Sequence, residues 1–240
     1  MGGYTRETVG QGETGDEGET GVLAAPKMLT APRMAAVAGI VFAVLFAIVL
    51  VLLHGTLEHD FASGAPLSDE RRTRLTIAMK LMPFAGIAFL WFIAVIRDGL
   101  GRAEDRFYAT VFLASGIVFL TMMFVATAIA AGLVTGTAHG DPHLPPGVVS
   151  FGAAAAATAS KTFALRMAAV FMISLATIWW KTRLMPKWLA LVTYAGALTL
   201  LVIGDLSQWV TLSFPTWVLV VSLVMVSRAG RTDPGLRPAG

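Results

Sequence analysis

Residues 34–53 read MAAVAGIVFAVLFAIVLVLL, an uncharged and mostly apolar run between Arg33 and His54. At about 1.5 Å of rise per residue, a helix over this run covers the roughly 30 Å hydrocarbon layer of a bilayer. Helices on the surface of soluble domains carry a polar face and do not use uncharged runs of this length. The run therefore predicts a membrane-spanning helix.

The rest of the chain holds further apolar segments of the same kind. They cover residues 75–96, about 108–133, 162–180 and 188–227. The last of these is long enough for two crossings, and its single charge, Asp205, lies near the middle, where a tight turn is expected. We therefore expect an all-α fold, a polytopic membrane helical bundle with six transmembrane helices.

One transmembrane domain is expected over residues 31–228, with a tail at each end. Residues 1–30 are poor in large apolar side chains and rich in Gly, Thr and Glu, which predicts a disordered acidic cytoplasmic tail and not a signal peptide. Residues 229–240 are expected to form a short basic cytoplasmic tail. The Ala-rich residues 151–160 predict a weak helix that either lies on the surface or extends the fourth span.

The composition excludes several classes of function. Of the 240 residues, 56% are hydrophobic and 14% are charged, whereas about a quarter of the residues of an ordinary soluble domain are charged. Cysteine is absent, which excludes disulfides, thiolate metal sites and cysteine nucleophiles. No nucleotide-binding or hydrolase motif occurs, so the sequence favours a protein that is not an enzyme and leaves the cofactor unknown.

The positive charges between the spans predict the orientation. If successive loops alternate between the two sides, one side collects twelve Lys and Arg residues and the other collects four. The positive-inside rule assigns the richer side, which includes both termini, to the cytoplasm. The expected location is the cytoplasmic membrane, with several passes and both termini cytoplasmic.

Two cations lie inside predicted spans, at matching positions. Lys80 belongs to TIAMKL (76–81) and Arg166 to TFALRM (162–167), and the two segments are offset by 86 positions. This match predicts a parallel internal repeat that relates spans 1 and 2 to spans 3 and 4. On that register, the two cations are expected at one depth near the outer ends of their helices.

Two interpretations of Lys80 and Arg166 stay open. Long basic side chains can snorkel, with their stems in hydrocarbon and their charged heads at the lipid headgroups. Alternatively, one of them pairs with Asp205 while the other binds an anion or a lipid phosphate. On the second interpretation, Lys80, Arg166 and Asp205 form the candidate ligand-binding site.

All four histidines are expected on the extracytoplasmic side, close to carboxylates. Imidazole and carboxylate groups are ligands of zinc and copper(II). Unperturbed imidazole also has a pKa of about 6.5, so it can respond to protons. The spacing is not diagnostic of a metal site, because loop histidines are mostly solvated. The candidate ligands of a metal- or proton-responsive site are His54, His59, His139, His143 and Asp141.

The last third of the chain carries a resemblance. Its segments are FALRMAAVF (163–171), RLMPKWLA (183–190) and FPTWVLVVSL (214–223). Over residues 160–227 the chain resembles uncharacterised six-span membrane proteins of high-GC Gram-positive bacteria. The resemblance implies a fold and a bacterial cytoplasmic-membrane location, without an activity, a substrate or a catalytic residue.

Three hypotheses on function follow. The leading one is binding and transport of a small solute, an ion or a lipid through an outward-facing vestibule. The second is a non-catalytic structural or accessory subunit of a membrane complex, and the third is the extracytoplasmic metal- or proton-responsive site. The expected partners are membrane lipids and either a second copy of the chain or another membrane subunit, with no nucleic acid.

Overall fold

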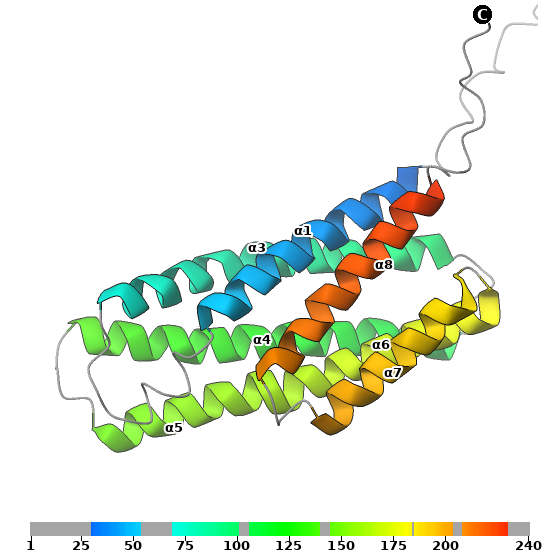
Figure 1. The fold of residues 1–240 in the computed structure, drawn as a ribbon. Helices are drawn as coiled ribbons and strands as arrows, with labels where there is room; N and C mark the ends of the chain where they lie inside the picture. Colours follow the sequence, from blue (N-terminus) through cyan, green and yellow to red (C-terminus); the bar gives the residue numbers. More distant parts are fainter. Residues whose placement is uncertain are drawn as a thin grey trace, which may run out of the picture.

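The computed structural model describes residues 30–53, 69–100, 106–139, 145–183, 185–203 and 208–229. All regular secondary structure in these residues is helical (Figure 1), which confirms the predicted all-α class. The elements are α1 (Thr30–Leu53), α3 (Asp69–Leu100), α4 (Arg106–His139), α5 (Pro146–Ala157), η3 (Thr158–Ala164), α6 (Leu165–Thr182), α7 (Lys187–Ile203), η4 (Gln208–Leu212) and α8 (Ser213–Ala229).

The helices form a bundle with two distinct ends. We call the end where α1 begins and α8 ends the terminal end, and the end where α4 ends and α5 begins the distal end (Figure 1). α1 packs against α3 and α8, and α7 packs against α6. α4 packs against α3, α5 and α6, so it joins one side of the bundle, formed by α1, α3 and α8, to the other side, formed by α6 and α7.

The fourth long helix is continuous but irregular. α5, the π-helical η3 and α6 follow one another without a break, and the backbone at both junctions stays in the right-handed helical region. The Ala-rich residues 151–160 therefore extend the fourth span instead of lying apart on the surface. α5 begins at Pro146, whose missing N–H costs nothing in a first turn.

Several helices are long and apolar enough to cross a membrane. Within the described residues there are five, namely Met34–Leu53, Arg72–Gly99, Phe107–Gly136, Gly147–Thr182 and Val210–Arg228, and a further apolar helix, Lys187–Val202, is shorter. Large apolar side chains cover the outer faces of these helices; Phe84, for example, is 62% exposed. Outward apolar surface of this extent is typical of a multi-pass membrane protein.

Buried aromatic rings fill the middle of the bundle. The central aromatic cluster consists of Phe42, Phe46, Phe89, Phe112, Phe119, Phe171, Phe214 and Trp217. These rings come from α1, α3, α4, α6 and α8, and neighbouring centroids lie as close as 4.6 Å. Aromatic pairs contribute about 0.5–1.5 kcal/mol each beyond area burial. The cluster is therefore the main apolar contact between the two sides of the bundle.

One glycine permits the closest helix contact in this core. A Cβ added at Gly39 of α1 would overlap the Oγ of Ser222 in α8 and lie 2.8 Å from the ring of Phe92 in α3. Small residues allow membrane helices to approach closely, which strengthens van der Waals packing. Gly39 therefore sets the spacing of α1, α3 and α8.

A polar contact ties α7 to the bundle. The hydroxyls of Thr177 in α6 and Tyr194 in α7 lie 2.7 Å apart. Thr177 also bonds the carbonyl of Ile173 at 2.8 Å, as hydroxyls in membrane helices commonly do. This contact adds a directional interaction to the packing of the shortest apolar span.

Candidate functional site

Arg166 is the best-positioned functional side chain in the described residues. It is the second residue of α6, directly after the π-helical η3, and its side chain is half-buried. Its Nη1 donates to the carbonyl oxygen of Thr162 at 2.9 Å. This bond holds the guanidinium against its own helix and sets its orientation.

The central aromatic cluster fixes the depth of Arg166. Phe171 lies five residues farther along α6 and contacts Phe214, the second residue of α8, with 6.2 Å between ring centroids. Five residues of helix correspond to about 7.5 Å, so Arg166 lies about that far from Phe171 toward the distal end. The buried interior continues past this level, because Leu133 and Ala153 are buried farther toward the distal end.

Lys80 occupies a different environment. Its side chain is exposed, and it shares the outward face of α3 with exposed apolar residues such as Ile77, Phe84 and Trp91. That face points away from the central aromatic cluster, to which α3 contributes Phe89. Lys80 is thus a cation on the outer surface of the bundle.

The two cations therefore differ in exposure, because the Lys80 side chain is exposed and the Arg166 side chain is half-buried. Asp205, the third predicted site residue, lies outside the described residues.

The π-helical segment beside Arg166 was not foreseen from the sequence. η3 packs against α4 and carries half-buried Lys161, which lies about one turn farther toward the distal end than Arg166. The Ser160 hydroxyl donates to the carbonyls of Ala156 and Ala157 at 2.9 and 3.2 Å. Such side-chain bonds compete with regular helical bonding, and π segments frequently occur at functional sites.

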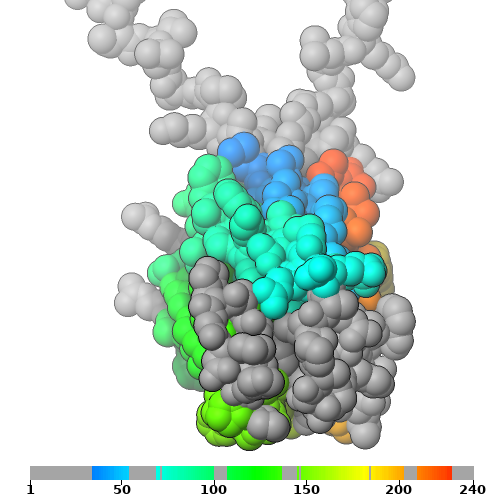
Figure 2. Space-filling view, turned by 90° about the vertical axis from the view of Figure 1, so that its left-hand side faces the viewer, coloured from blue at the N-terminus to red at the C-terminus, as the bar shows by residue number. Residues whose placement is uncertain are grey.

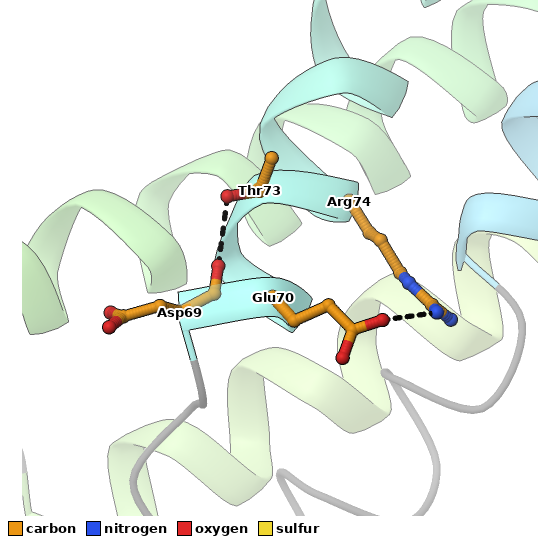
Figure 3. A network of polar contacts seen from close by, with 4 residues as sticks. All are labelled: Asp69, Glu70, Thr73 and Arg74. Atoms are coloured by element: carbon orange, nitrogen blue, oxygen red, sulfur yellow. Dashed lines mark hydrogen bonds and ion pairs between the residues drawn. The ribbon is translucent and has the colours of Figure 1, made fainter.

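The distal end of α3 carries further charge, at positions before the second span predicted over residues 75–96. Arg74 donates to Glu70 at 2.5 Å, and the Thr73 hydroxyl donates to the carbonyl of Asp69 at 2.9 Å (Figure 3). Both partners of the ion pair are largely exposed, so the pair contributes little to stability. Figure 2 views this end, with the start of α3 in cyan above the start of α5.

Arg72 differs from these exposed neighbours. Its side chain is half-buried, and its Nε is buried without a hydrogen-bond partner. One turn along the helix, Leu75 belongs to a small apolar cluster with Leu133, Val134 and Ala153. A buried N–H without a partner carries a cost of about 1–3 kcal/mol. The RRTR run at 71–74 is the sequence signal that could have drawn attention to this position.

The predicted metal ligands are mostly beyond the described part of the chain. His54, His59, Asp141 and His143 lie outside it, and His139 is described only as the last residue of the α4 backbone. Among the side chains that the structure describes, no group of three or more His, Asp or Glu residues could hold a metal ion.

The arrangement around Arg166 is suited to anion binding. A guanidinium presents a planar fork that matches carboxylate and phosphate, and Lys161 adds positive charge on the distal side. Comparisons of the chain with protein families, with curated proteins and with solved structures give no match.

Proposed function

We propose that the chain spans the cytoplasmic membrane of a bacterium six times, with both termini in the cytoplasm. Five membrane-length helices and the shorter Lys187–Val202 support six crossings. Arg97, Lys181, Arg183, Lys187 and Arg228 gather at the terminal end, as expected for the cytoplasmic side. The terminal end is then cytoplasmic, and the distal end is extracytoplasmic.

We further propose that the protein binds a small anionic group at its extracytoplasmic end, as a step in solute or lipid transport. The observation that carries this proposal is the half-buried Arg166, placed beside a π-helical segment and five residues from Phe171 of the central aromatic cluster. A charge inside a span costs about 2.5–3.5 kcal/mol on insertion scales, so a retained one marks a functional site by default. Asp205 is the proposed carboxylate of the same site.

The central aromatic cluster defines what transport requires. Because its rings are buried and in contact, an ion cannot pass straight along the bundle axis without repacking of α6 and α8. The π-helical η3 offers a place where α6 can change register relative to α5. Alternating access by movement of α6 is therefore the proposed mode, in preference to an open channel.

The proposed parallel repeat fits this view. α1 packs against α3, and α4 packs against α6 in the same way, so each proposed half contains one packed helix pair. Parallel repeats related by an axis along the membrane normal occur in transporters. In this chain, the second half carries the half-buried cation and the first half carries the exposed one.

Anion-dependent thermal stabilisation tests the proposal. The purified full chain is expected to unfold at a higher temperature with inorganic phosphate or with phosphatidylglycerol than with chloride or phosphatidylcholine. Arg166→Gln lowers the response below that of wild type, and Arg166→Lys keeps more of it than Arg166→Gln because the charge stays while the fork is lost. Lys80→Gln serves as the matched control and should keep the response, since Lys80 faces outward.

The outcomes separate the two sources of the anion and the two cations. A response to phosphate indicates a soluble anion, whereas a response to phosphatidylglycerol alone indicates a lipid. An equal response in wild type and Arg166→Gln contradicts the proposal. Loss of the response in Lys80→Gln would instead favour the two-cation vestibule predicted from the sequence.

A second candidate function, an accessory subunit of a membrane complex, is favoured by the outer face of α4. Ala128, Gly132 and Gly136 are exposed at four-residue spacing, and a Cβ added at Gly132 meets open space. Small residues at this spacing allow another membrane helix to approach closely. Gly132→Leu with Gly136→Leu should then release a stoichiometric partner that co-purifies in mild detergent, and an unchanged subunit composition would exclude this face.

A further inference from the structure

The turn between α6 and α7 combines three cations with two tryptophans. Lys181, Arg183 and Lys187 are exposed at this turn, and Trp180 and Trp188 flank them with 49% and 53% of their surface exposed. We name this set the basic–aromatic turn. It lies at the terminal end, opposite to Arg166, and is independent of the function proposed for that residue.

The backbone of the turn is tightly organised. Arg183 ends α6 in the left-handed conformation, with φ 54° and ψ 21°. A side chain in this region costs about 1–2 kcal/mol relative to glycine, which is the usual residue at such a helix end. Pro186 directly precedes α7, and its carbonyl accepts the N–H of Leu189 at 3.0 Å. An arginine is thus held in a strained position where glycine would be easier.

Lys181 is also held in place. Its Nζ lies 4.3 Å from the centroid of the Tyr108 ring, near the start of α4. A cation over an aromatic face gains about 0.5–1 kcal/mol at an exposed site. This contact fixes one ammonium beside the turn and links α6 to α4.

The cations continue directly into apolar surface. Beyond Trp188, the exposed face of α7 carries Leu191, Val192 and Leu198, which are 57%, 54% and 62% exposed. A ligand that covers both parts needs an anionic head and an apolar tail. Nucleic acids and acidic peptides have the charge but not the tail, whereas an anionic phospholipid has both.

We propose that the basic–aromatic turn is a binding site for an anionic phospholipid of the leaflet at the terminal end. Arg183 presents its fork to the phosphodiester, and Lys187 and Lys181 add point charges. Trp180 and Trp188 lie at the headgroup level, where amphipathic rings are most stable, and the acyl chains run along α7. The strained Arg183 is retained because its guanidinium holds the headgroup.

Native mass spectrometry of the detergent-solubilised full chain tests this site. Wild type is expected to bind phosphatidylglycerol more tightly than phosphatidylcholine. Arg183→Gln with Lys187→Gln should weaken phosphatidylglycerol binding on the order of thirtyfold, because each cation near a membrane surface contributes about a factor of five. Gln keeps the unbranched side chain of Arg, so the backbone cost at residue 183 stays similar.

The matched control removes the same charge from the same end. Arg97→Gln with Arg228→Gln lies outside the turn and should keep wild-type affinity for phosphatidylglycerol. The comparison is repeated in an Arg166→Gln background, so that a lipid held at the distal end is not counted. Loss of all phosphatidylglycerol binding in Arg166→Gln alone would contradict this site and would support the anion site at the other end.

Three results would overturn the proposal. They are equal weakening in both double variants, equal affinity of wild type for the two lipids, and displacement of phosphatidylglycerol by inorganic phosphate at similar concentration. Equal weakening would mean that only the total charge matters, and displacement by phosphate would mean that the apolar tail contributes nothing. If the double variant does not fold, Arg183→Gln and Lys187→Gln are measured singly. Unchanged affinity for phosphatidylglycerol in both single variants then also overturns the proposal.

Discussion

The indole of Trp217 in α8 is hydrogen-bonded to Thr193 in α7, with 2.9 Å between Nε1 and Oγ1. Thr193 is fully buried and its hydroxyl donates to the carbonyl of Leu189 at 2.7 Å. The bond to Thr193 satisfies the only polar atom of the indole, which otherwise packs among Phe171, Phe214 and Trp179.

Replacing Thr193 with Val leaves the Trp217 N–H without its acceptor. The expected loss of stability is about 1–2 kcal/mol, since buried donors are costly but interhelical bonds in membranes are modest. Thr199→Val is the control, because Thr199 makes the same local bond to a carbonyl four residues earlier but is exposed. Thermal unfolding in detergent measures both, and equal loss in the two variants would show that the indole bond is not important.

Replacing Gly39 with Ala should disrupt the contact of α1 with α3 and α8. The new methyl group meets Ser222 Oγ and the Phe92 ring, and overpacking of this kind costs about 1–3 kcal/mol. Gly132→Ala has open space and should be neutral or slightly stabilising, because Ala is the better helix former. Adding Ser222→Ala to Gly39→Ala should recover part of the loss, since the Ser222 hydroxyl is buried without a partner.

Truncation of Phe171 tests the central aromatic cluster. Its ring is fully buried and lies among Phe89, Phe112 and Phe214, so Phe171→Ala is expected to cost about 3–5 kcal/mol. Phe151→Ala is the matched control, because Phe151 is 76% exposed on the same long helix. The prediction fails if the two variants unfold at similar temperatures.

The orientation can be tested by chemical labelling of single cysteines, because the natural chain has none. Ser63→Cys, at a position between α1 and α3 in the sequence, should react with a membrane-impermeant maleimide on intact cells. Gly235→Cys in the C-terminal tail should react only after lysis. The opposite labelling pattern would reverse the proposed orientation and move the basic–aromatic turn to the outer leaflet.

The class of fold could be predicted from the sequence, because an uncharged run such as residues 34–53 has the length and composition of a helix that crosses the hydrocarbon layer of a bilayer. The environment of Lys80 could not. The apolar residues around Lys80 occur on all sides of α3, so only packing against α1 and α4 decides that the lysine faces outward. Arg166 has similar sequence neighbours but lies on a half-buried position, which explains why equal spacing gave unequal environments.

Two other features depend on contacts between distant segments. The central aromatic cluster gathers single rings from five helices, and the register that brings Phe89 beside Phe171 has no local signal. The π-helical η3 follows an alanine run that would also suit a regular α-helix, so its place emerges only from packing against α4. The basic–aromatic turn, by contrast, is visible in the sequence as WWKTRLMPKW, residues 179–188.

The unequal helices of the bundle have a consequence for the surrounding lipid. α4 has 34 residues, about 51 Å of helix, whereas α7 has 17, about 26 Å. A bilayer of even thickness cannot match both, so hydrophobic mismatch should thin the lipid beside α7 or tilt the whole molecule. A protein of this shape would favour thinner membrane regions and lend a local curvature to its boundary lipids.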